Sequence, residues 1–411
     1  GRGRAGAAPA VAGRRAAVTV TPAVAFVTYS IKPRGGVVHT LAVAEALGAL
    51  GTAVEVIALA EPGQGFYRDV TVPWRTVEAP PPASTLEERV FNSVDALAAG
   101  LEAMGDSLPP ILHTQDCISA RAACRVRDRG RPTTVVRTVH HVDDFSTPAL
   151  IDCQRRAIYE PDRVLVVSRT WQRIMCEDYG IQADIVPNGV DLARFGASPD
   201  PAVLAGLRAR VGATGRFLCL TVGGLEPRKG SDVLMRALAT TAEMAGVAPV
   251  LVVVGGHSFQ DHRAYRQAVL DSLPGLGLEL GRDVVLLGTV PDQELPAWYH
   301  AADAFVFPSV TEGWGLVVME AMAAGLPVVA TAIPVFEEYL TSGVDALLSA
   351  PGDDHGLATS LSTLMGDASV GRRLAAGGRA VAKRFGWDAS ARNHLEVYRH
   401  IAAETLRVDP K

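Results

Sequence analysis

The sequence of 411 residues lacks several features that would each point to a particular class of protein. It has no run of about 20 apolar residues without charge, so we expect no membrane-spanning helix. Its formal net charge of -5 provides no overall basic field, which argues against a nucleic-acid partner. Lysine is rare: only four of the 39 basic residues are lysines, and this bias toward arginine indicates a bacterial gene rich in G and C.

Cysteine is also scarce. The five cysteines are Cys117, Cys124, Cys153, Cys176 and Cys219. Their number is odd and no Cys-x-x-Cys pair occurs, which is unlike a disulfide framework or a zinc site and is typical of a reducing compartment. We therefore expect a cytoplasmic protein without a metal site.

The N-terminus has almost no large apolar side chains. Residues 1–17 are Ala, Gly and Arg, apart from Pro9 and Val11. This stretch has no apolar core long enough for a secretory signal peptide. We expect residues 1–17 to be a disordered leader outside the fold.

What the sequence does contain is a succession of apolar, strand-like runs separated by helical stretches. With 48% hydrophobic residues and this length, two domains of roughly 150 residues or more are expected. The runs lie at residues 24–29, 54–59, 111–113, 134–139, 164–167, 217–222, 249–254, 284–287, 304–307 and 327–331. Apolar strands that alternate with helices imply parallel sheets buried on both faces. The predicted fold class is therefore α/β, with two doubly wound parallel-sheet domains that face a cleft.

The turn at Pro187-Asn188-Gly189 precedes a seam near residues 190–215. We place an N-terminal domain at residues 18–195 and a C-terminal domain at 196–387. The last helical stretch, about 388–411, is expected to return to the first domain. Ligands bind at the carboxyl ends of such sheets, but this fold serves transferases, epimerases, phosphorylases and some binding proteins alike.

The most specific motif is the segment 312–320, in which Glu312 and Glu320 bracket seven residues. A helix that starts near Gly315 would point its free N–H groups at phosphate or sugar oxygens. Glu320 lies about one turn further along, where its carboxylate can accept hydrogen bonds from both hydroxyls of a ribose. Glu312, at the strand end, can hold hydroxyls of a transferred sugar. The alternative is a loop with two solvated glutamates, but the small, apolar residues that follow predict a buried helix whose carboxylate needs partners.

Two other glycine-containing loops follow strands. Arg228 and Lys229 stand between a strand and a helix, and an arginine fork beside a lysine point charge suits a diphosphate. A solvated turn is an equal alternative, because such loops are common. Gly35 and Gly36 let a phosphate approach the start of a helix, although their spacing is not a dinucleotide fingerprint and a plain tight turn is the simpler interpretation.

Two histidines and two aspartates follow the strand at 134–139. They are His140, His141, Asp143 and Asp144. Imidazoles and carboxylates at the carboxyl end of a sheet suit a binding site, while a structural histidine is the alternative. Metal ligation is not favoured, because no second cluster of ligands completes a site.

A basic run lies between these features. It comprises Arg121, Arg125, Arg127, Arg129 and Arg131, and is broken by one aspartate. Peripheral contact with an anionic membrane surface is one interpretation. We favour a solvated helix face.

Together the motifs resemble the retaining GT-B glycosyltransferases that are often called group 1, or family four. The resemblance covers nearly all of residues 23–406. It rests on Gly35-Gly36 with His39, Thr138-Val139-His140, the segment 186–191, Arg228-Lys229-Gly230, and the segment 308–320. It implies two Rossmann-like domains, with the donor mostly on the C-terminal one and the acceptor mostly on the N-terminal one. It also implies retention of anomeric configuration, no metal, and no cofactor beyond a nucleotide sugar as co-substrate.

The resemblance also assigns residues to roles. Arg228 and Lys229 would hold the donor diphosphate, Gly35 and Gly36 would meet the same phosphates from the other domain, and Glu320 would bind the ribose. The transferred sugar would be positioned by Glu312 and the backbone amides of Gly313, Trp314, Gly315 and Leu316, and His140 would contact the sugar and the reacting centre. One position departs from the pattern: Gly224 stands where many relatives carry an arginine, which Arg228 can replace.

The expected donor is a UDP- or GDP-sugar, and the acceptor is a small molecule, a glycan or a lipid that the sequence does not name. Cations aimed at the leaving diphosphate would stabilise the transition state more than the ground state. No carboxylate is clearly placed as a covalent nucleophile, so we expect front-face substitution in which the leaving phosphate helps to deprotonate the acceptor. The alternatives are a nucleotide-sugar epimerase that uses Asp143 and Asp144, a phosphorylase, and a non-catalytic nucleotide-sugar binding protein.

Overall fold

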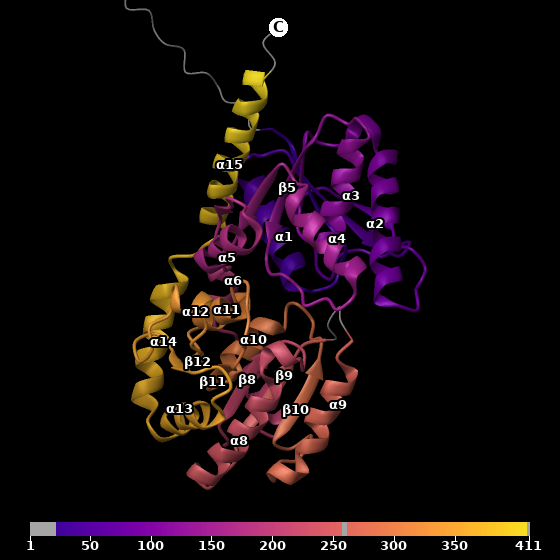
Figure 1. Ribbon diagram of the computed structural model, residues 1–411. Helices are drawn as coiled ribbons and strands as arrows, with labels where there is room; N and C mark the ends of the chain where they lie inside the picture. Colours follow the sequence, from indigo (N-terminus) through magenta and orange to yellow (C-terminus); the bar gives the residue numbers. More distant parts are fainter. Residues whose placement is uncertain (1–21, 257–260, 409–411) are drawn as a thin grey trace, which may run out of the picture.

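The structure is a computed structural model that describes residues 22–256 and 261–408. Two parallel sheets follow one another along the chain, each covered by helices on both faces (Figure 1). The predicted leader at residues 1–17 lies outside the described residues.

The first sheet has seven strands in the order β3-β2-β1-β4-β5-β6-β7. These strands are β1 (Val24–Thr28), β2 (Val54–Ala60), β3 (Trp74–Glu78), β4 (Ile111–Thr114), β5 (Thr134–Val139), β6 (Arg163–Val166) and β7 (Asp184–Ile185). The helices between them are α1 (Gly35–Ala49), α2 (Leu86–Ala103), η1 (Gly105–Ser107), α3 (Cys117–Asp128), α4 (Pro148–Tyr159) and α5 (Arg169–Tyr179). The strand order reverses direction between β1 and β4, so the loops after these two strands open a crevice at the carboxyl end of the sheet.

The second sheet has six strands in the order β10-β9-β8-β11-β12-β13. These strands are β8 (Leu218–Val222), β9 (Val250–Val254), β10 (Val284–Gly288), β11 (Ala304–Phe307), β12 (Val328–Thr331) and β13 (Leu347–Ser349). Its helices are α6 (Leu192–Gly196), α7 (Pro201–Arg210), η2 (Pro227–Lys229), α8 (Ser231–Ala245), α9 (Arg263–Ser272), η3 (Pro274–Leu276), α10 (Leu295–Ala301), α11 (Leu316–Ala324), α12 (Pro334–Glu337), α13 (Asp354–Gly366) and α14 (Ala368–Ala382), and the chain ends with α15 (Trp387–Val408). The reversal here falls between β8 and β11.

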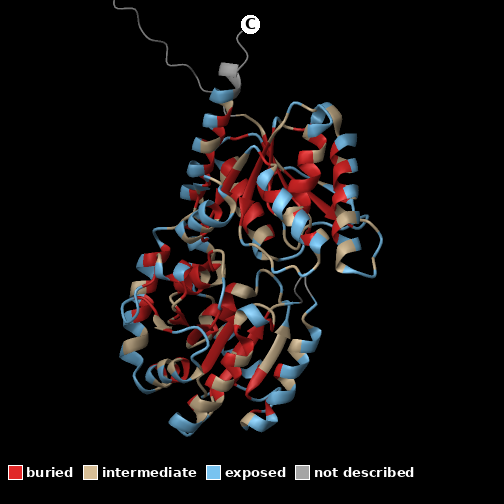
Figure 2. Ribbon diagram, in the orientation of Figure 1, coloured by how far each residue is buried: buried red, intermediate tan, exposed pale blue. Residues whose placement is uncertain are grey.

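The prediction of two Rossmann-like domains is confirmed, and the central strands lie where the apolar runs placed them. Figure 2 shows that the interior strands of both sheets are buried. Three edge strands, β3, β7 and β13, were not predicted. In β3 only Val77 is buried, because an edge strand with one covered position has no continuous apolar run.

The C-terminal helix α15 returns to the first domain, as predicted, and runs beside it in Figure 1. Its buried side chains Leu395, Tyr398 and Ile401 join the core formed with α1. The Tyr398 hydroxyl also lies 2.6 Å from Nδ1 of the buried His113 in β4. Packing against α1 thus fixes the end of the chain on the N-terminal domain.

The two domains are connected where the chain crosses between them. The Val190 amide donates to the Phe385 carbonyl at 2.9 Å, and a Cβ on Gly189 would overlap the backbone of Trp387, so the outgoing and returning segments lie against each other. At α5, the backbone amides of Arg169 and Thr170 donate to the carboxylate of Glu338, at 2.9 and 2.7 Å. A helix N-terminus that receives a carboxylate is a favourable contact, so it fixes one domain against the other.

The basic run is only partly the solvated face that we favoured. Each of its arginines pairs with a carboxylate of the same domain, and several of these pairs join α3 to α2 or to the end of α4. The pairs are Arg121–Glu160, Arg125–Asp95, Arg127–Asp162, Arg129–Glu102 and Arg131–Asp106. Arg121 is itself buried, which corrects the prediction at that position. Within the described residues, each positive charge of the run therefore has a carboxylate partner.

Three histidines are fully buried between the first sheet, α1 and α15. They are His39, His113 and His394. The ring centres of His39 and His394 lie 5.9 Å apart, and those of His113 and His394 lie 5.5 Å apart. Burial lowers the pKa of His39 to about 3 and that of His394 to about 4, and it holds the His113 pKa well below its ordinary value.

These histidines predict acid sensitivity. Between about pH 6.5 and 4 the unfolded chain binds protons at these side chains and the folded chain does not, so the free energy of unfolding should fall as the pH falls. One such histidine contributes about 2 kcal/mol between pH 6.5 and 5. Urea unfolding across this range should show a flatter pH dependence for His394→Phe, whereas the exposed control His355→Phe should keep the wild-type slope. An unchanged slope in His394→Phe would rule out this account.

Candidate active site

Loops from both domains meet at one place, at the facing carboxyl ends of the two sheets. Gly36 lies in the first turn of α1 after β1, His140 follows β5, and Gly313 follows β11. A Cβ on Gly313 would overlap the backbone oxygen of His140, and a Cβ on Gly36 would lie 3.9 Å from the His140 Cδ2 atom. Gly36, His140 and Gly313 are far apart in the sequence, and the structure brings them together as the sequence analysis predicted.

Gly315 turns the chain into α11. Its φ of +88° lies in the left-handed region, and a Cβ there would also overlap the ring of Phe336, so glycine is required twice over. Helix α11 begins at Leu316, as the motif predicted, and leaves free N–H groups at the meeting point of the loops. The side chain of Trp314 packs against Tyr339 and Phe385 in the core, so only its backbone can serve a ligand.

The loop after β8 places two cations beside the Glu312 carboxylate. Lys229 Nζ lies 2.5 Å from Glu312 Oε1, and Arg228 Nη1 lies 3.3 Å from the same oxygen. Arg228 also lies 3.4 Å from Glu226, which precedes it in the loop. At Gly224, a Cβ would lie 2.9 Å from the Glu226 carboxylate, so this position has little room for the arginine of the family pattern.

The ion pairs of Glu312 with Lys229 and Arg228 determine the charge state of its carboxyl group. Burial by itself would raise the pKa of Glu312, but Lys229 and Arg228 outweigh it and hold the pKa below its ordinary value. Burial lowers the pKa of Lys229, and Glu312 opposes that shift. Ser309 Oγ donates to Glu312 Oε1 as well, at 2.6 Å. Oε1 therefore takes all three contacts, and Oε2 has no hydrogen bond within the described residues, which leaves it for a ligand.

Glu320 lies on α11 at the wall of a separate cavity. Its Oε2 accepts a hydrogen bond from the Tyr299 hydroxyl at 2.7 Å. Burial raises the pKa of Glu320 to about 6, while Tyr299 and Arg194 oppose the rise. The carboxylate therefore has the buried helix and the partner that the motif predicted, and its second oxygen has no hydrogen bond in the described part of the chain.

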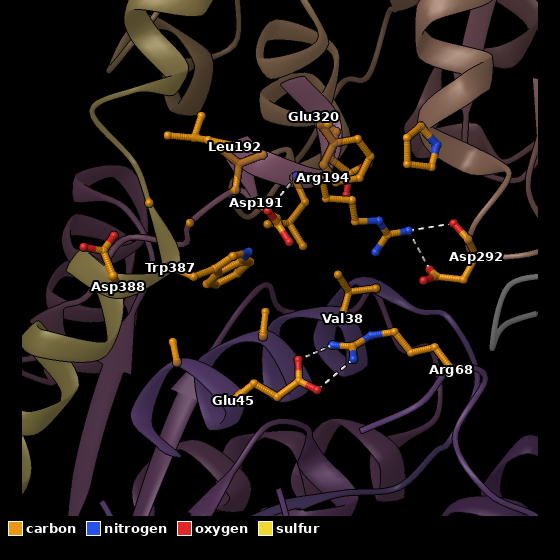
Figure 3. A pocket seen from close by; sticks show the side chains of 18 of the residues that line it. Val38, Glu45, Arg68, Asp191, Leu192, Arg194, Asp292, Glu320, Trp387 and Asp388 are labelled. Carbon is orange, nitrogen blue, oxygen red and sulfur yellow. Dashed lines mark hydrogen bonds and ion pairs between the residues drawn. The ribbon is translucent and has the colours of Figure 1, made fainter. Parts of the chain in front are cut away.

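The cavity has a volume of about 820 Å³ and lies between α1 and the C-terminal domain. Figure 3 shows two ion pairs on its walls, Glu45 with Arg68 from the N-terminal domain and Arg194 with Asp292 from the C-terminal domain. Glu320 and Leu316 line it, whereas Glu312, Lys229 and His140 do not. The cavity is thus large enough for a nucleoside beside Glu320, and the cation group lies outside it.

His140 is half-buried and held by its own domain. Its Nε2 lies 3.0 Å from Gln115 Oε1 in the loop after β4, and its ring packs edge-on against His39 at 4.7 Å. Burial, with His39 and Arg137 nearby, holds the pKa of His140 well below its ordinary value, so the ring is neutral. A neutral, oriented imidazole can accept or donate a hydrogen bond at the meeting point of the loops.

Sequence reasoning missed residues that hold these groups in place. The Trp171 indole on α5 donates to the Glu312 carbonyl at 3.0 Å, so the N-terminal domain holds the backbone of a C-terminal motif. Ser309 and Tyr299 fix the two glutamates. Trp171 and Tyr299 belong to no glycine-rich or charged cluster, so no local pattern marked them, and Ser309 lies in the segment 308–320 but was given no role.

Comparison with known proteins shows the family to which the chain belongs. Residues 33–194 match the family described as Glycosyltransferase Family 4, and residues 216–367 match the one described as Glycosyl transferases group 1. A D-inositol 3-phosphate glycosyltransferase of Xylanimonas cellulosilytica is 33% identical over 307 residues, which cover 70% of this chain and 71% of that protein. The chain is a group 1 glycosyltransferase. The family resemblance predicted from the motifs is therefore confirmed.

Solved structures agree with the GT-B fold of this transferase. Sucrose-phosphate synthase of Thermosynechococcus elongatus superposes with a TM-score of 0.79 at 22% identity, over 93% of this chain and all of that one. HepE of Anabaena, solved in complex with UDP-glucose, gives a TM-score of 0.71 at 20% identity, over 94% of this chain and all of that one. At such identities the likeness concerns the fold alone. No helix among the described residues of the transferase is long and apolar enough to span a membrane.

Proposed function

We propose that the transferase moves a sugar from a UDP-sugar to a hydroxyl of a small anionic acceptor, with retention of anomeric configuration. The observation that carries this proposal is the joint placement of Lys229, Arg228 and Glu312 against His140 of the other domain. Two adjacent cations, the largely buried Lys229 and the exposed Arg228, near the N-terminus of a helix are suited to the diphosphate of a nucleotide sugar.

The donor would lie across both parts of the site. Its nucleoside would occupy the cavity, with the ribose hydroxyls on Glu320. Its diphosphate would lie against Lys229, Arg228 and the N-terminus of α11, with Gly35 and Gly36 approaching from the N-terminal domain. The transferred sugar would then reach Glu312 Oε2, the amides of residues 313–316, and His140. The UDP-glucose complex of HepE supports a UDP-sugar as the first donor to test.

The proposed mechanism follows from the charges that develop on the diphosphate and on the sugar during the reaction. Cleavage of the bond between the sugar and the phosphate builds negative charge on the departing diphosphate, and Lys229 and Arg228, which pair with Glu312 in the structure, would stabilise that charge. Glu312 lies beside the anomeric carbon, where positive charge grows. We propose front-face substitution, in which a leaving phosphate oxygen takes the proton of the acceptor hydroxyl as the new bond forms. The acceptor would bind to the N-terminal domain, and the names of the relatives, which act on D-inositol 3-phosphate, make a phosphorylated polyol the first choice.

Nucleotide release from UDP-, GDP- and ADP-sugars, measured with and without D-inositol 3-phosphate, tests this function. A transferase should release nucleoside diphosphate faster with an acceptor. An epimerase that uses Asp143 and Asp144 should release it without any acceptor, a phosphorylase should require inorganic phosphate, and a binding protein should release none. Any of these three outcomes would overturn the proposal.

Activity should survive chelation, because Lys229, Arg228 and the helix N-terminus neutralise the diphosphate. Within residues 22–256 and 261–408, no three His, Cys, Asp or Glu side chains are grouped so that they could hold a metal ion. The measurement is the turnover rate with and without EDTA. Complete loss of activity, restored by magnesium or manganese, would contradict the metal-independent mechanism.

Donor affinity should weaken as the pH falls below about 6, because protonation of Glu320 removes an acceptor for the ribose hydroxyls. The diphosphate of a nucleotide sugar is a diester and keeps its charge through this range, so the change can be assigned to the protein. Calorimetric binding of a UDP-sugar across this pH range should lose its pH dependence in Glu320→Gln and keep it in the exposed control Glu337→Gln. The same fall in affinity in Glu320→Gln would assign the titration to another group.

A further inference from the structure

Arg137 on β5 is a buried arginine without an ion-pair partner among the described residues. It is 6% exposed, its Nη1 donates to the Thr138 carbonyl, and its Nε has no hydrogen-bond partner. Arg121, which is buried to the same degree, pairs with Glu160. Burying a guanidinium without a partner costs several kcal/mol. Arg137 therefore needs an anionic partner, and the described residues do not supply one.

The nearest carboxylates are engaged elsewhere. Asp116 accepts hydrogen bonds from Thr28 Oγ1 at 3.2 Å, the Tyr29 amide at 3.0 Å and the Ser119 amide at 2.7 Å. The Asp143 carboxylate lies 3.4 Å from His141 Nε2. Burial lowers the pKa of Arg137, and Asp116 and Asp143 only partly offset it from a distance. An arriving anion would thus meet one unpaired guanidinium.

The position of Arg137 places that anion near the reacting centre. Arg137 pairs with Thr114 of β4 and lies three residues before His140, at the carboxyl end of the first sheet. Next to Thr114, Gln115 has its Oε1 at His140 and leaves Nε2 buried without a partner. Gln115 directly follows β4 and Arg137 lies two residues before the end of β5, so two buried donors without partners among the described residues lie on adjacent strands near their carboxyl ends. Both belong to the domain opposite the cation loop of Lys229, which leaves them for the second substrate.

We propose that Arg137 binds an anionic group, a phosphate or a carboxylate, of the acceptor. This inference rests on the proposed function, because it assigns a part of the acceptor to the N-terminal domain. A planar guanidinium can hold either group through two parallel hydrogen bonds. The anion would fix the acceptor so that a hydroxyl of the same molecule faces His140 and the anomeric carbon. Neutral sugars and polyols would lack this contact and would be poor acceptors.

The test is calorimetric binding of inorganic phosphate and of citrate to the full chain in the Lys229→Ala background, which removes one cation of the proposed donor site. We expect phosphate or citrate to bind, and Arg137→Met to weaken that binding at least about tenfold, as loss of a bidentate contact requires. The control Arg125→Met removes a half-exposed, paired arginine of the same domain and should bind as the parent does. The ligand that binds with the higher affinity, phosphate or citrate, shows whether the anionic group of the acceptor is a phosphate or a carboxylate.

The outcomes separate this proposal from the function itself. Equal binding in Arg137→Met and its parent, or no binding of either anion, would overturn the role of Arg137. If Arg137→Met does not fold, Arg137→Lys keeps the charge without the fork, and unchanged affinity there would count against a bidentate site. UDP binding to the wild-type chain tests the donor site independently. If UDP does not bind, the proposed function is contradicted, whereas the result for anion binding at Arg137 is unaffected.

Discussion

Lys229→Ala should lower kcat/KM by about 10²-fold or more, because it deletes a charge contact to the leaving diphosphate. In the structure Lys229 also pairs with Glu312 at 2.5 Å, and its ammonium lies 4.5 Å from the centre of the Phe307 ring. The variant therefore loses the charge that holds Glu312 in place as well as the contact to phosphate. Steady-state kinetics with the best donor of the UDP-, GDP- and ADP-sugar panel measure the effect.

Two further variants separate charge from packing in this experiment. Lys383→Ala removes another of the four lysines, from an exposed position after α14, and should retain wild-type kinetics. Lys229→Arg keeps the charge and should recover part of the rate. Urea unfolding of each variant shows whether the loss is local to the site. Wild-type kinetics in a folded Lys229→Ala would remove the cation loop from the active site.

Glu312→Gln should lower kcat by roughly 10- to 10³-fold, the scale of a single electrostatic contact in a transition state. In the proposed mechanism Glu312 would lie where positive charge grows on the sugar, so its contribution would be larger in the transition state than in the ground state. Glu320→Gln should instead raise the donor KM and weaken binding of the free nucleoside diphosphate, because the ribose does not change during the reaction. Kinetics and calorimetry on this matched pair separate the two roles.

The contacts of Glu312 sharpen this comparison. Its Oε1 holds Lys229, Arg228 and Ser309, and a glutamine would keep these distances while it removes the negative charge. The affinity for the diphosphate should therefore change little in Glu312→Gln, because Lys229 and Arg228 stay in place and lose only their ion pair with the carboxylate. If Glu312→Gln weakens diphosphate binding while Glu320→Gln leaves it intact, the two roles are assigned the wrong way round.

The sequence predicted those parts of the site that depend on local patterns. A glycine at position 315 and an apolar stretch after Glu320 were sufficient to predict a buried helix that begins beside this glycine. The central strands were equally predictable, because strands covered on both faces form continuous apolar runs. The edge strand β3 has one buried residue and escaped this criterion.

What the sequence did not reveal depends on contacts between distant segments. Trp171 holds the Glu312 backbone from another domain, and Tyr299 lies 21 residues from the Glu320 carboxylate that it contacts. The missing ion pair of Arg137 is of the same kind, since only the packed sheet shows that no carboxylate of the described residues pairs with it. Trp314 also stands in the middle of the motif, yet its side chain belongs to the core.

The most direct test of the account follows the anomeric carbon itself. A UDP-sugar labelled with ¹³C at C1 is incubated with the full chain and D-inositol 3-phosphate, and the C1 signal is followed by NMR. We expect this signal to move from the diphosphate ester to a new glycoside with the same anomeric configuration, and to move more slowly in the Lys229→Ala and Glu312→Gln variants. A C1 signal that moves to the opposite anomer, to free sugar alone or to an epimerised nucleotide sugar would contradict the claim that this chain is a retaining, nucleotide-sugar-dependent transferase.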